Sequence, residues 1–376
     1  MRKGVGSPDP FRVVIAGGGT GGHVFPGIAV AREMALRRPH ATISFAGTTR
    51  GIESRVVPRE GFALDLIRSA GLKGKSIVQR VRGAALLPLS LVDAWRIVSR
   101  RRPDVVIGVG GYSSGPVVLV AALRGIPTLL LEQNAVPGLT NRLLAGVVRS
   151  AAVSFDSTRE FFGAKAFVSG NPVRPEFFTA AGSPAEAASA GRVLIFGGSQ
   201  GAHAINVAMA EATEELASRA PHLRFTHQTG ERDAQMVRAA YRKAGLSAEV
   251  APFFDDMARR LEQADLVVCR AGATTLAEIT AAGRPAILVP LPEATDDHQR
   301  KNAEALAAAG AAQVLIQSGL TGHTLAGRIV ALAADRDVRA RMSAAARALA
   351  HPEAAGLIVD KALDLTSGAR HPEEAT

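Results

Sequence analysis

The sequence is poor in residues on which several classes of protein depend. Among 376 residues there is one cysteine, Cys269, which excludes an internal disulfide framework and fits a reducing, cytoplasmic compartment. One Trp and two Tyr offer few platforms for stacking the bases of single-stranded nucleic acid, so we expect no nucleic-acid partner. No apolar run approaches the roughly 18 to 20 residues of a bilayer span, and the N-terminus lacks the hydrophobic stretch of a signal peptide. We therefore expect a chain that neither spans a membrane nor enters a secretory route.

Length and charge narrow the remaining classes. A chain of 376 residues exceeds the size at which a single hydrophobic core keeps growing, so two domains are expected. The formal net charge of +10 favours an anionic partner. With nucleic acid set aside, that partner is a phosphorylated substrate or the headgroups of anionic lipid.

The most informative feature is a pattern that occurs twice: an apolar strand that runs into a glycine-rich turn and then a helix. The first copy is Arg12-Val-Val-Ile-Ala-Gly-Gly-Gly-Thr-Gly-Gly-His23, and the second is Arg192-Val-Leu-Ile-Phe-Gly-Gly-Ser-Gln-Gly-Ala-His203. Glycines let the backbone turn sharply and let a ligand come close, and the N–H groups of a helix N-terminus attract anions. Two such halves predict a cleft that holds a phosphate-bearing molecule.

Short apolar runs separated by alanine- and leucine-rich stretches predict an α/β fold with two doubly wound, parallel-sheet domains. The strands expected in the first domain are 13–16, 42–45, 105–108, 128–131 and 151–154. Those expected in the second domain are 193–196, 224–227, 266–269, 286–289 and 312–315. In such sheets, ligands bind outside the carboxyl ends of the strands.

The prolines and glycine of Gly170-Asn-Pro-Val-Arg-Pro175 indicate the boundary between the domains. We assign residues 11–172 to an N-terminal domain and residues 173–350 to a C-terminal domain. A periodic stretch after Pro352 predicts a last helix over 353–366 that packs back on the N-terminal domain. Residues 1–10 and 367–376 are expected to be flexible tails.

The spacing of Gly17, Gly19 and Gly22 also matches a dinucleotide-binding turn. A nicotinamide or flavin enzyme needs an acidic residue at the end of the second strand to hold a ribose, whereas here no carboxylate occurs until Glu53. The sequence therefore disfavours a dinucleotide. The alternative that the glycines only allow tight strand-to-helix packing is weaker for two matched turns than for one.

Two polar residues are candidates for chemistry. His23 follows the first glycine turn, where the field of the helix end would keep it neutral, as a general base must be; the alternative is a structural or solvated histidine. Glu278 comes about one helical turn after Thr274 and Thr275, close enough to a predicted crevice to accept two hydrogen bonds from a ribose diol. The alternative is an ordinary exposed helix carboxylate.

Acidic pairs do not indicate a metal. The pairs at residues 255–256 and 296–297 lack the alternating spacing that would present two carboxylates to one cation. We therefore expect neither a metal nor a cofactor. The polar run 296–302 follows the turn after another predicted strand. Because ligands bind at the carboxyl ends of such strands, this position favours a role at the ligand site over that of a solvated surface.

Further motifs run in order along essentially the whole chain: Gly17-Gly-Gly-Thr-Gly-Gly-His-Val-Phe-Pro26, Gly110-Gly-Tyr-Ser-Ser-Gly-Pro116, Glu132-Gln-Asn134 with Pro137-Gly-Leu-Thr-Asn141, Gly170-Asn-Pro-Val-Arg174, Gly197-Gly-Ser-Gln-Gly-Ala202 and Arg270-Ala-Gly-Ala-Thr-Thr. This set resembles the MurG family of bacterial peptidoglycan glycosyltransferases. The resemblance implies a GT-B architecture, in which two Rossmann-like domains face a central cleft. It also implies transfer of N-acetylglucosamine from UDP-N-acetylglucosamine to undecaprenyl-diphosphate-linked muramyl-pentapeptide (lipid I), giving lipid II, by one inverting displacement.

The resemblance further implies site residues. Donor-binding roles fall on Thr20, Gly21, Gly22, Asn134, Arg174, Ser199, Phe254, Ala273, Thr274, Glu278, Gln299 and Asn302. Ser199 and Arg174 are expected near the diphosphate, the backbone near Phe254 at the uracil, and Glu278 at the ribose. His23 is implied as the general base with Glu132 as the alternative, because Leu131 stands where many members have a histidine. Residues on both domains can meet one ligand only if the domains close, so the junction 171–175 is the expected hinge.

A lipid-linked acceptor would explain the stretch 72–95, which combines leucines and Trp95 with the basic residues Lys73, Lys75, Arg80 and Arg82. The alternative is a core helix with a solvated basic lead-in. The resemblance implies a peripheral protein at the cytoplasmic face of the cell membrane, with an anionic membrane surface and other cell-wall synthesis proteins as partners. A glycosyltransferase with a diacylglycerol acceptor, a nucleotide-sugar-binding subunit and a UDP-sugar epimerase are the competing functions.

Overall fold

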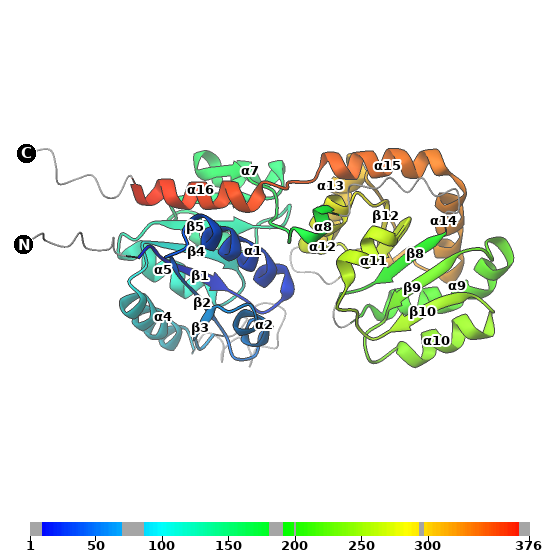
Figure 1. The fold of residues 1–376 in the computed structure, drawn as a ribbon, viewed down its shortest axis with the longest axis horizontal. Helices are drawn as coiled ribbons and strands as arrows, with labels where there is room; N and C mark the ends of the chain where they lie inside the picture. The colour runs from blue at the N-terminus through cyan, green and yellow to red at the C-terminus, as the bar shows by residue number, and fades with distance from the viewer. Residues whose placement is uncertain (1–9, 70–85, 180–190, 199–200, 293–296, 368–376) are drawn as a thin grey trace, which may run out of the picture. The chain divides into compact units, whose positions relative to one another are not determined.

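The computed structural model describes residues 10–69, 86–179, 191–198, 201–292 and 297–367. The chain divides into two compact units (Figure 1). Unit 1 comprises residues 1–172 and 353–376, and unit 2 comprises residues 173–352. Each unit is a parallel sheet with helices packed against it.

Unit 1 is built on a seven-stranded sheet with the order β3-β2-β1-β4-β5-β6-β7. Its strands are β1 (Arg12–Gly17), β2 (Thr42–Gly47), β3 (Ala63–Leu66), β4 (Val105–Gly110), β5 (Thr128–Glu132), β6 (Ser150–Val153) and β7 (Ala166–Val168). Its helices are α1 (Gly21–Arg37), α2 (Glu53–Arg59), α4 (Leu87–Arg101), α5 (Ser114–Leu123), α6 (Leu139–Leu144), α7 (Asp156–Phe162), the short η1 (Gly163–Lys165) and α16 (Ala354–Ser367).

Alternate residues of the central strands supply the two cores of unit 1, because successive side chains of a strand point to opposite faces. Val13 and Ile15 pack in one core with residues of α1. The same core contains Ile358, Val359 and Ala362, so α16 packs beside α1 although it is the last helix in the chain (Figure 1). The other face of the sheet is covered by α4 and α5.

Unit 2 is built on a six-stranded sheet with the order β10-β9-β8-β11-β12-β13. Its strands are β8 (Arg192–Phe196), β9 (Arg224–Gln228), β10 (Ser247–Ala251), β11 (Leu266–Cys269), β12 (Ala286–Leu288) and β13 (Ala312–Val314). Its helices are α8 (Glu176–Thr179), α9 (His203–Arg219), α10 (Ala234–Lys243), α11 (Met257–Gln263), α12 (Ala273–Ala282), α13 (His298–Ala308), the short η4 (Gln317–Gly319), α14 (Gly322–Ala334) and α15 (Arg336–Ala348).

Both sheets repeat one topology. In each, the first strand of the unit lies between the second and the fourth, so the chain order reverses between β1 and β4 and between β8 and β11. Open α/β sheets bind ligands at the carboxyl ends of the strands beside this reversal. The first glycine turn and Gly110 lie there in unit 1, and the second glycine turn and Arg270 lie there in unit 2.

The predicted fold class is confirmed: all ten predicted strands are present, in two parallel, doubly wound sheets. The sequence analysis missed three strands. These are β3, β7 and β10, which each form an edge of a sheet.

Candidate active site

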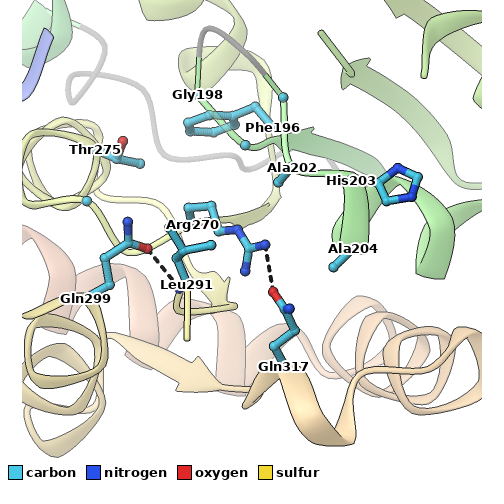
Figure 2. A pocket seen from close by; sticks show the side chains of 13 residues that line it. Phe196, Gly198, Ala202, His203, Ala204, Arg270, Thr275, Leu291, Gln299 and Gln317 are labelled. Carbon is cyan, nitrogen blue, oxygen red and sulfur yellow. Dashed lines mark hydrogen bonds between the residues drawn. The ribbon is translucent and has the colours of Figure 1, made fainter. Parts of the chain in front are cut away.

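A cavity of about 520 Å³ opens beside the second glycine turn of unit 2 (Figure 2). Its lining comes from the carboxyl ends of β8 and β11, from the start of α9 and α12, and from the segments after β12 and β13. The lining residues are Phe196, Gly197, Gly198, Gly201, Ala202, His203, Ala204, Arg270, Gly272, Thr275, Leu291, Gln299 and Gln317. Among these described residues Arg270 is a cation and none is acidic, so this part of the cavity suits an anionic ligand.

Arg270 is a cation that lines this cavity (Figure 2). Its Nη1 donates to the carbonyl oxygens of Val289 and Pro290 at 3.0 and 3.2 Å, and its Nη2 donates to Gln317 Oε1 at 2.7 Å. Burial lowers the pKa of the guanidinium from its ordinary value. All of these partners are neutral, and a partly desolvated cation with neutral partners attracts a negatively charged ligand.

Glu278 lies on α12 and is partly buried. Burial raises its pKa to about 7, opposed by the nearby positive charge of Arg174 and reinforced by the negative charge of Glu176. Arg174 pairs with Glu176 at 3.3 Å and lies over the ring of Phe177 at 5.0 Å. The carboxyl group is therefore close to a cation and poised between its two protonation states near neutral pH.

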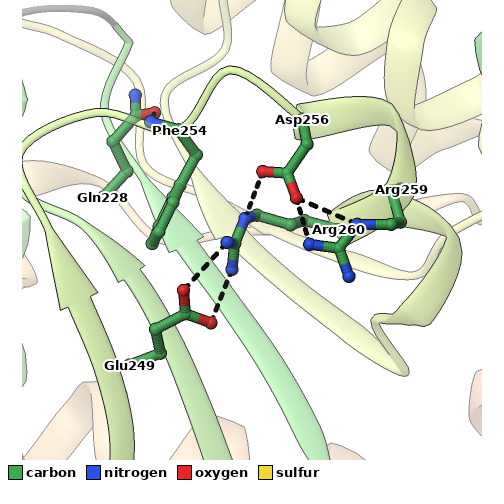
Figure 3. Close-up of polar contacts among 6 residues, drawn as sticks. All are labelled: Gln228, Glu249, Phe254, Asp256, Arg259 and Arg260. Carbon is green, nitrogen blue, oxygen red and sulfur yellow. Dashed lines mark hydrogen bonds and ion pairs between the residues drawn. The ribbon is translucent and has the colours of Figure 1, made fainter.

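Gln228 connects the second glycine turn to the segment that contains Phe254. Its Nε2 donates to the carbonyl of Gly198 at 3.0 Å, and its Oε1 accepts the backbone N–H of Phe254 at 2.9 Å. The Arg260 guanidinium lies 3.6 Å from the centroid of the Phe254 ring. Figure 3 shows both side chains. Arg260 is itself held by both carboxylate oxygens of Glu249, at 2.7 and 2.8 Å. The Phe254 segment is therefore fixed from both sides.

The other predicted residues of unit 2 fall in different surroundings. Gln299 lines the cavity, and its Oε1 accepts the backbone N–H of Leu291 at 3.0 Å. Ala273 and Thr274 begin α12, between the lining residues Gly272 and Thr275. Asn302 is fully buried and donates to the carbonyl of Ala271 at 3.3 Å, so it supports the turn before α12 and does not line the cavity. Ser199 lies outside the described residues.

In unit 1, His23 lies in the first turn of α1, where Thr20 is the N-cap residue and Gly21 and Gly22 are the first helical residues. Gly110, at the end of β4, is directly against the imidazole. A Cβ added to Gly110 would lie 2.9 Å from both Nδ1 and Cε1 of His23. The backbone of Gly110 has φ +91°, a left-handed conformation that favours glycine. A glycine at this position thus makes room for the histidine.

Glu132 ends β5 and is 2% exposed. Its Oε1 accepts from the backbone N–H and the side-chain Nδ2 of Asn134, at 3.0 and 3.2 Å. Its Oε2 accepts from the backbone N–H of Gly138 and from Asn141 Nδ2, at 2.9 and 2.8 Å. Four donors therefore occupy the carboxylate, and the loop that carries Asn134 is folded around it.

Comparisons with known proteins agree with this geometry. Residues 13–153 match the glycosyltransferase family 28 N-terminal domain, and residues 192–358 match the glycosyltransferase family 28 C-terminal domain. A UDP-N-acetylglucosamine–N-acetylmuramyl-(pentapeptide) pyrophosphoryl-undecaprenol N-acetylglucosamine transferase of Anaeromyxobacter dehalogenans is 49% identical, over 94% of this chain and 93% of its own length. The enzyme of the same name from Myxococcus xanthus is 48% identical over the same shares. The crystal structure of MurG from Acinetobacter baumannii is 34% identical, with a TM-score of 0.76 over 94% of this chain and 100% of that chain.

The chain belongs to the MurG family of glycosyltransferases.

The structure brings together part of the set that the family resemblance implied. At the unit 2 cavity it gathers Gln299 and the first turn of α12. Glu278 and Arg174 interact with each other, but they are not among the described residues that line the cavity. In unit 1 it places Thr20, Gly21 and Gly22 in one turn with His23.

His203, Arg270 and Gln317 line the cavity of this MurG-family chain, and the sequence analysis gave them no binding role. Arg270 had a signal, since it directly follows a buried strand and opens a recognised motif. His203 also had one, because it ends the second copy of the repeated pattern. It is held by Asp233, whose two carboxylate oxygens both lie 3.0 Å from His203 Nδ1. Gln317 had none, because it lies in a segment without a motif.

A patch of exposed apolar residues lies on α4 of unit 1. It comprises Leu87, Leu89, Leu91, Val92 and Trp95, which are 38–56% exposed. Arg124 lies over the Trp95 ring at 4.8 Å. We call this set the α4 patch. Lys73, Lys75, Arg80 and Arg82 lie outside the described residues.

The described residues lack a membrane-spanning helix and a metal-binding cluster. No helix there is long and apolar enough to cross a membrane. Nor does that part of the chain hold a cluster of three or more His, Cys, Asp or Glu residues suited to a metal ion.

Proposed function

We propose that this chain transfers N-acetylglucosamine from UDP-N-acetylglucosamine to the 4-hydroxyl of the muramyl sugar of lipid I, which gives lipid II. The observation that carries the proposal is the unit 2 cavity: it lies at the reversal of strand order, beside a glycine turn, and holds Arg270, which donates its hydrogen bonds to neutral groups among the described residues. A nucleoside diphosphate in this cavity would bring negative charge to Arg270. The names of the relatives at 48–49% identity supply the sugar and the acceptor.

In this proposal unit 2 binds the donor. The diphosphate binds the second glycine turn, Ser199, Arg174 and Arg270. The uracil lies against the backbone near Phe254, the ribose diol donates to Glu278, and Gln299 faces the sugar. Asn302 acts indirectly, because it is buried and its hydrogen bond to the carbonyl of Ala271 supports the turn before α12.

Unit 1 binds the acceptor and supplies the base. The muramyl O4 forms a bond to C1 of N-acetylglucosamine while the bond from C1 to the diphosphate oxygen breaks, so the anomeric carbon inverts. His23 takes the proton of the hydroxyl, and UDP leaves with the electron pair of the broken bond, stabilised by Arg174 and Arg270. His23 is favoured over Glu132 as base because the Glu132 carboxylate is buried and already accepts four hydrogen bonds. Thr20, Gly21, Gly22 and Asn134 are the further donor-facing residues of this unit.

We place the protein at the cytoplasmic face of the cell membrane as a peripheral protein. The α4 patch supports this placement, since exposed Leu and Trp side chains insert at the boundary between lipid headgroups and acyl chains. Lys73, Lys75, Arg80 and Arg82 would add attraction to anionic headgroups. Contacts with other cell-wall synthesis proteins belong to the same proposal.

The test is transfer of labelled N-acetylglucosamine from its UDP carrier to a short-chain lipid I analogue, with diacylglycerol as a second acceptor and calorimetric UDP binding in parallel. Transfer to lipid I alone supports the proposal. Transfer to diacylglycerol instead, or UDP binding without any transfer, would replace it with one of the competing functions. Loss of transfer in both His23→Ala and Glu278→Ala, with UDP binding weakened only in the second, would support the assigned roles.

A further inference from the structure

The two glycine turns match in sequence but differ in what fills them. In unit 1 the first turn is occupied by the side chain of Glu53, the first residue of α2, which is completely buried. Glu53 Oε2 accepts the backbone N–H of Gly19 at 2.7 Å. Its Oε1 accepts the backbone N–H and the hydroxyl of Thr48 at 2.8 and 2.9 Å.

Three glycines from three segments make room for this carboxylate. A Cβ added to Gly18, Gly47 or Gly51 would overlap the Glu53 side chain. Gly18 belongs to the first glycine turn, Gly47 ends β2, and Gly51 precedes α2. A side chain surrounded in this way is held in one position, and its charge is held with it.

The position is one that a phosphate takes in other proteins. A glycine-rich turn between a strand and a helix uses its backbone N–H groups to bind anions. Here one of those N–H groups, that of Gly19, already binds a carboxylate of the same chain. Around the second turn the situation is reversed, since the described residues that line its cavity include a cation, Arg270, and no acidic residue.

We propose that Glu53 is a built-in anion of the first glycine turn. It fills the place that a phosphate would take and holds the turn that leads into Thr20 and the start of α1, so that the diphosphate of UDP is left to the second turn. Glu53 is on this view a positioning residue for the unit 1 half of the site. The expected effect of Glu53 on transfer rests on the proposed function. The need of the first glycine turn for an anion does not rest on it.

The first variant is Glu53→Ala, with Glu60→Ala as matched control. Glu60 follows the same helix and pairs with Arg32 at the surface. We expect Glu53→Ala to lower kcat for transfer by about ten-fold or more, since several hydrogen bonds to a charged acceptor are lost. The Kd for UDP stays unchanged, because UDP binds unit 2. Glu60→Ala keeps the parent values.

Formate tests the need for an anion. Sodium formate can refill the space left in Glu53→Ala, so it should raise both kcat and the melting temperature of that variant relative to sodium chloride at equal ionic strength. The parent chain and Glu60→Ala should not respond. A Glu53→Ala variant that formate does not affect would overturn the proposal, whereas absence of transfer by the parent chain would overturn only the proposed function.

Glu53→Gln separates charge from shape and serves if the alanine variant does not fold. The amide fills the same space, but its NH₂ faces the N–H donors of Gly19 or Thr48. We expect kcat to fall without a matching change in the Kd for UDP, and formate to give no rescue because the space is filled. A Gln variant with the full kcat and melting temperature of the parent would show that shape alone matters.

Discussion

Arg270 Nη2 donates a 2.7 Å hydrogen bond to Gln317 Oε1, across 47 residues of sequence (Figure 2). The amide oxygen orients the guanidinium without neutralising it. Arg270 also donates to two backbone carbonyls, so its direction is fixed while its charge is still available to a ligand. This is the arrangement expected of a group that binds a diphosphate and stabilises it as it leaves.

Replacing the cation tests this role. We expect Arg270→Gln to raise the Kd for UDP by about ten-fold or more, because hydrogen bonds to charged groups contribute about 1.5–3 kcal/mol. The Kd for uridine, which has no phosphate, should change little. Calorimetric titration with both ligands makes the comparison. Gln317→Ala keeps the charge and should have the smaller effect; equal weakening of uridine and UDP would argue against a phosphate contact.

Glu278 makes stability depend on pH. Its pKa of about 7 in the folded chain lies above the ordinary value of 4.5, so between these values the folded state binds more protons than the unfolded state. The free energy of unfolding should therefore fall as pH rises from about 4.5 to about 7 and then level off. Glu278→Gln removes the charge and should stabilise the chain at pH 8 by about 1–3 kcal/mol, with little effect near pH 5. Urea unfolding at both pH values measures this; an equal effect at both would exclude a raised pKa.

The strands that the sequence predicted and those it did not differ in burial. Central strands such as β4, with every residue buried, read as continuous apolar runs. The missed strands are edges that pack on fewer neighbours: β3 reads Ala-Leu-Asp-Leu, and β10 is nowhere fully buried. An edge strand needs no apolar run, so periodicity could not separate it from a loop.

The features of the candidate site also differ in whether the sequence alone could predict them. The glycine turns after β1 and β8 could be predicted because their signals are local, with a strand before them and a helix after them. The bridge from Gln228 to Gly198 and Phe254 could not, since it depends on β9 lying beside β8 and on the chain returning from β10. The role of Glu53 was hidden for the same reason. The sequence places it 34 residues from Gly19, and only the pairing of β1 with β2 brings them together.

Glu132 is expected to be essential for structure rather than for proton transfer. Because four donors face its carboxylate, Glu132→Gln would point an NH₂ group at another donor and destabilise the chain by about 1–3 kcal/mol. Thermal unfolding measures this, with the exposed Asp156→Asn as control. A Gln variant that is as stable as the parent and yet inactive would return Glu132 to the role of base.

The α4 patch should govern binding to lipid. Leu91→Ser with Trp95→Ser removes two exposed apolar side chains and should weaken sedimentation with anionic vesicles by about ten-fold, since burying one such side chain contributes about 1.5–3 kcal/mol. Leu36→Ser is the control, because Leu36 is 77% exposed on α1 and lies outside the patch. Unchanged binding of the double variant would dismiss the patch, and strong weakening by Leu36→Ser would show that any exposed leucine suffices.

The contact between His23 and Gly110 allows the proposed base to be tested in two ways, by replacing His23 and by displacing its imidazole. We expect His23→Ala to lower kcat by about 10²–10⁴, the usual contribution of a general base. Gly110→Ala should lower kcat as well, because its Cβ would lie 2.9 Å from the imidazole and push the ring aside. Neither change should alter the Kd for UDP, which binds unit 2 in our proposal.

Gly125 provides the matched control for backbone strain. Its φ of +73° is also left-handed, but a Cβ there would meet nothing within 4 Å. Both alanine variants should therefore lose stability, because an L-residue in this conformation costs roughly 1–2 kcal/mol. Only Gly110→Ala should also lose kcat at temperatures where both variants are folded. If both variants lost activity only in proportion to their loss of stability, the contact between Gly110 and His23 would have no part in catalysis. The assignment of His23 as the base would then depend on the result for His23→Ala alone.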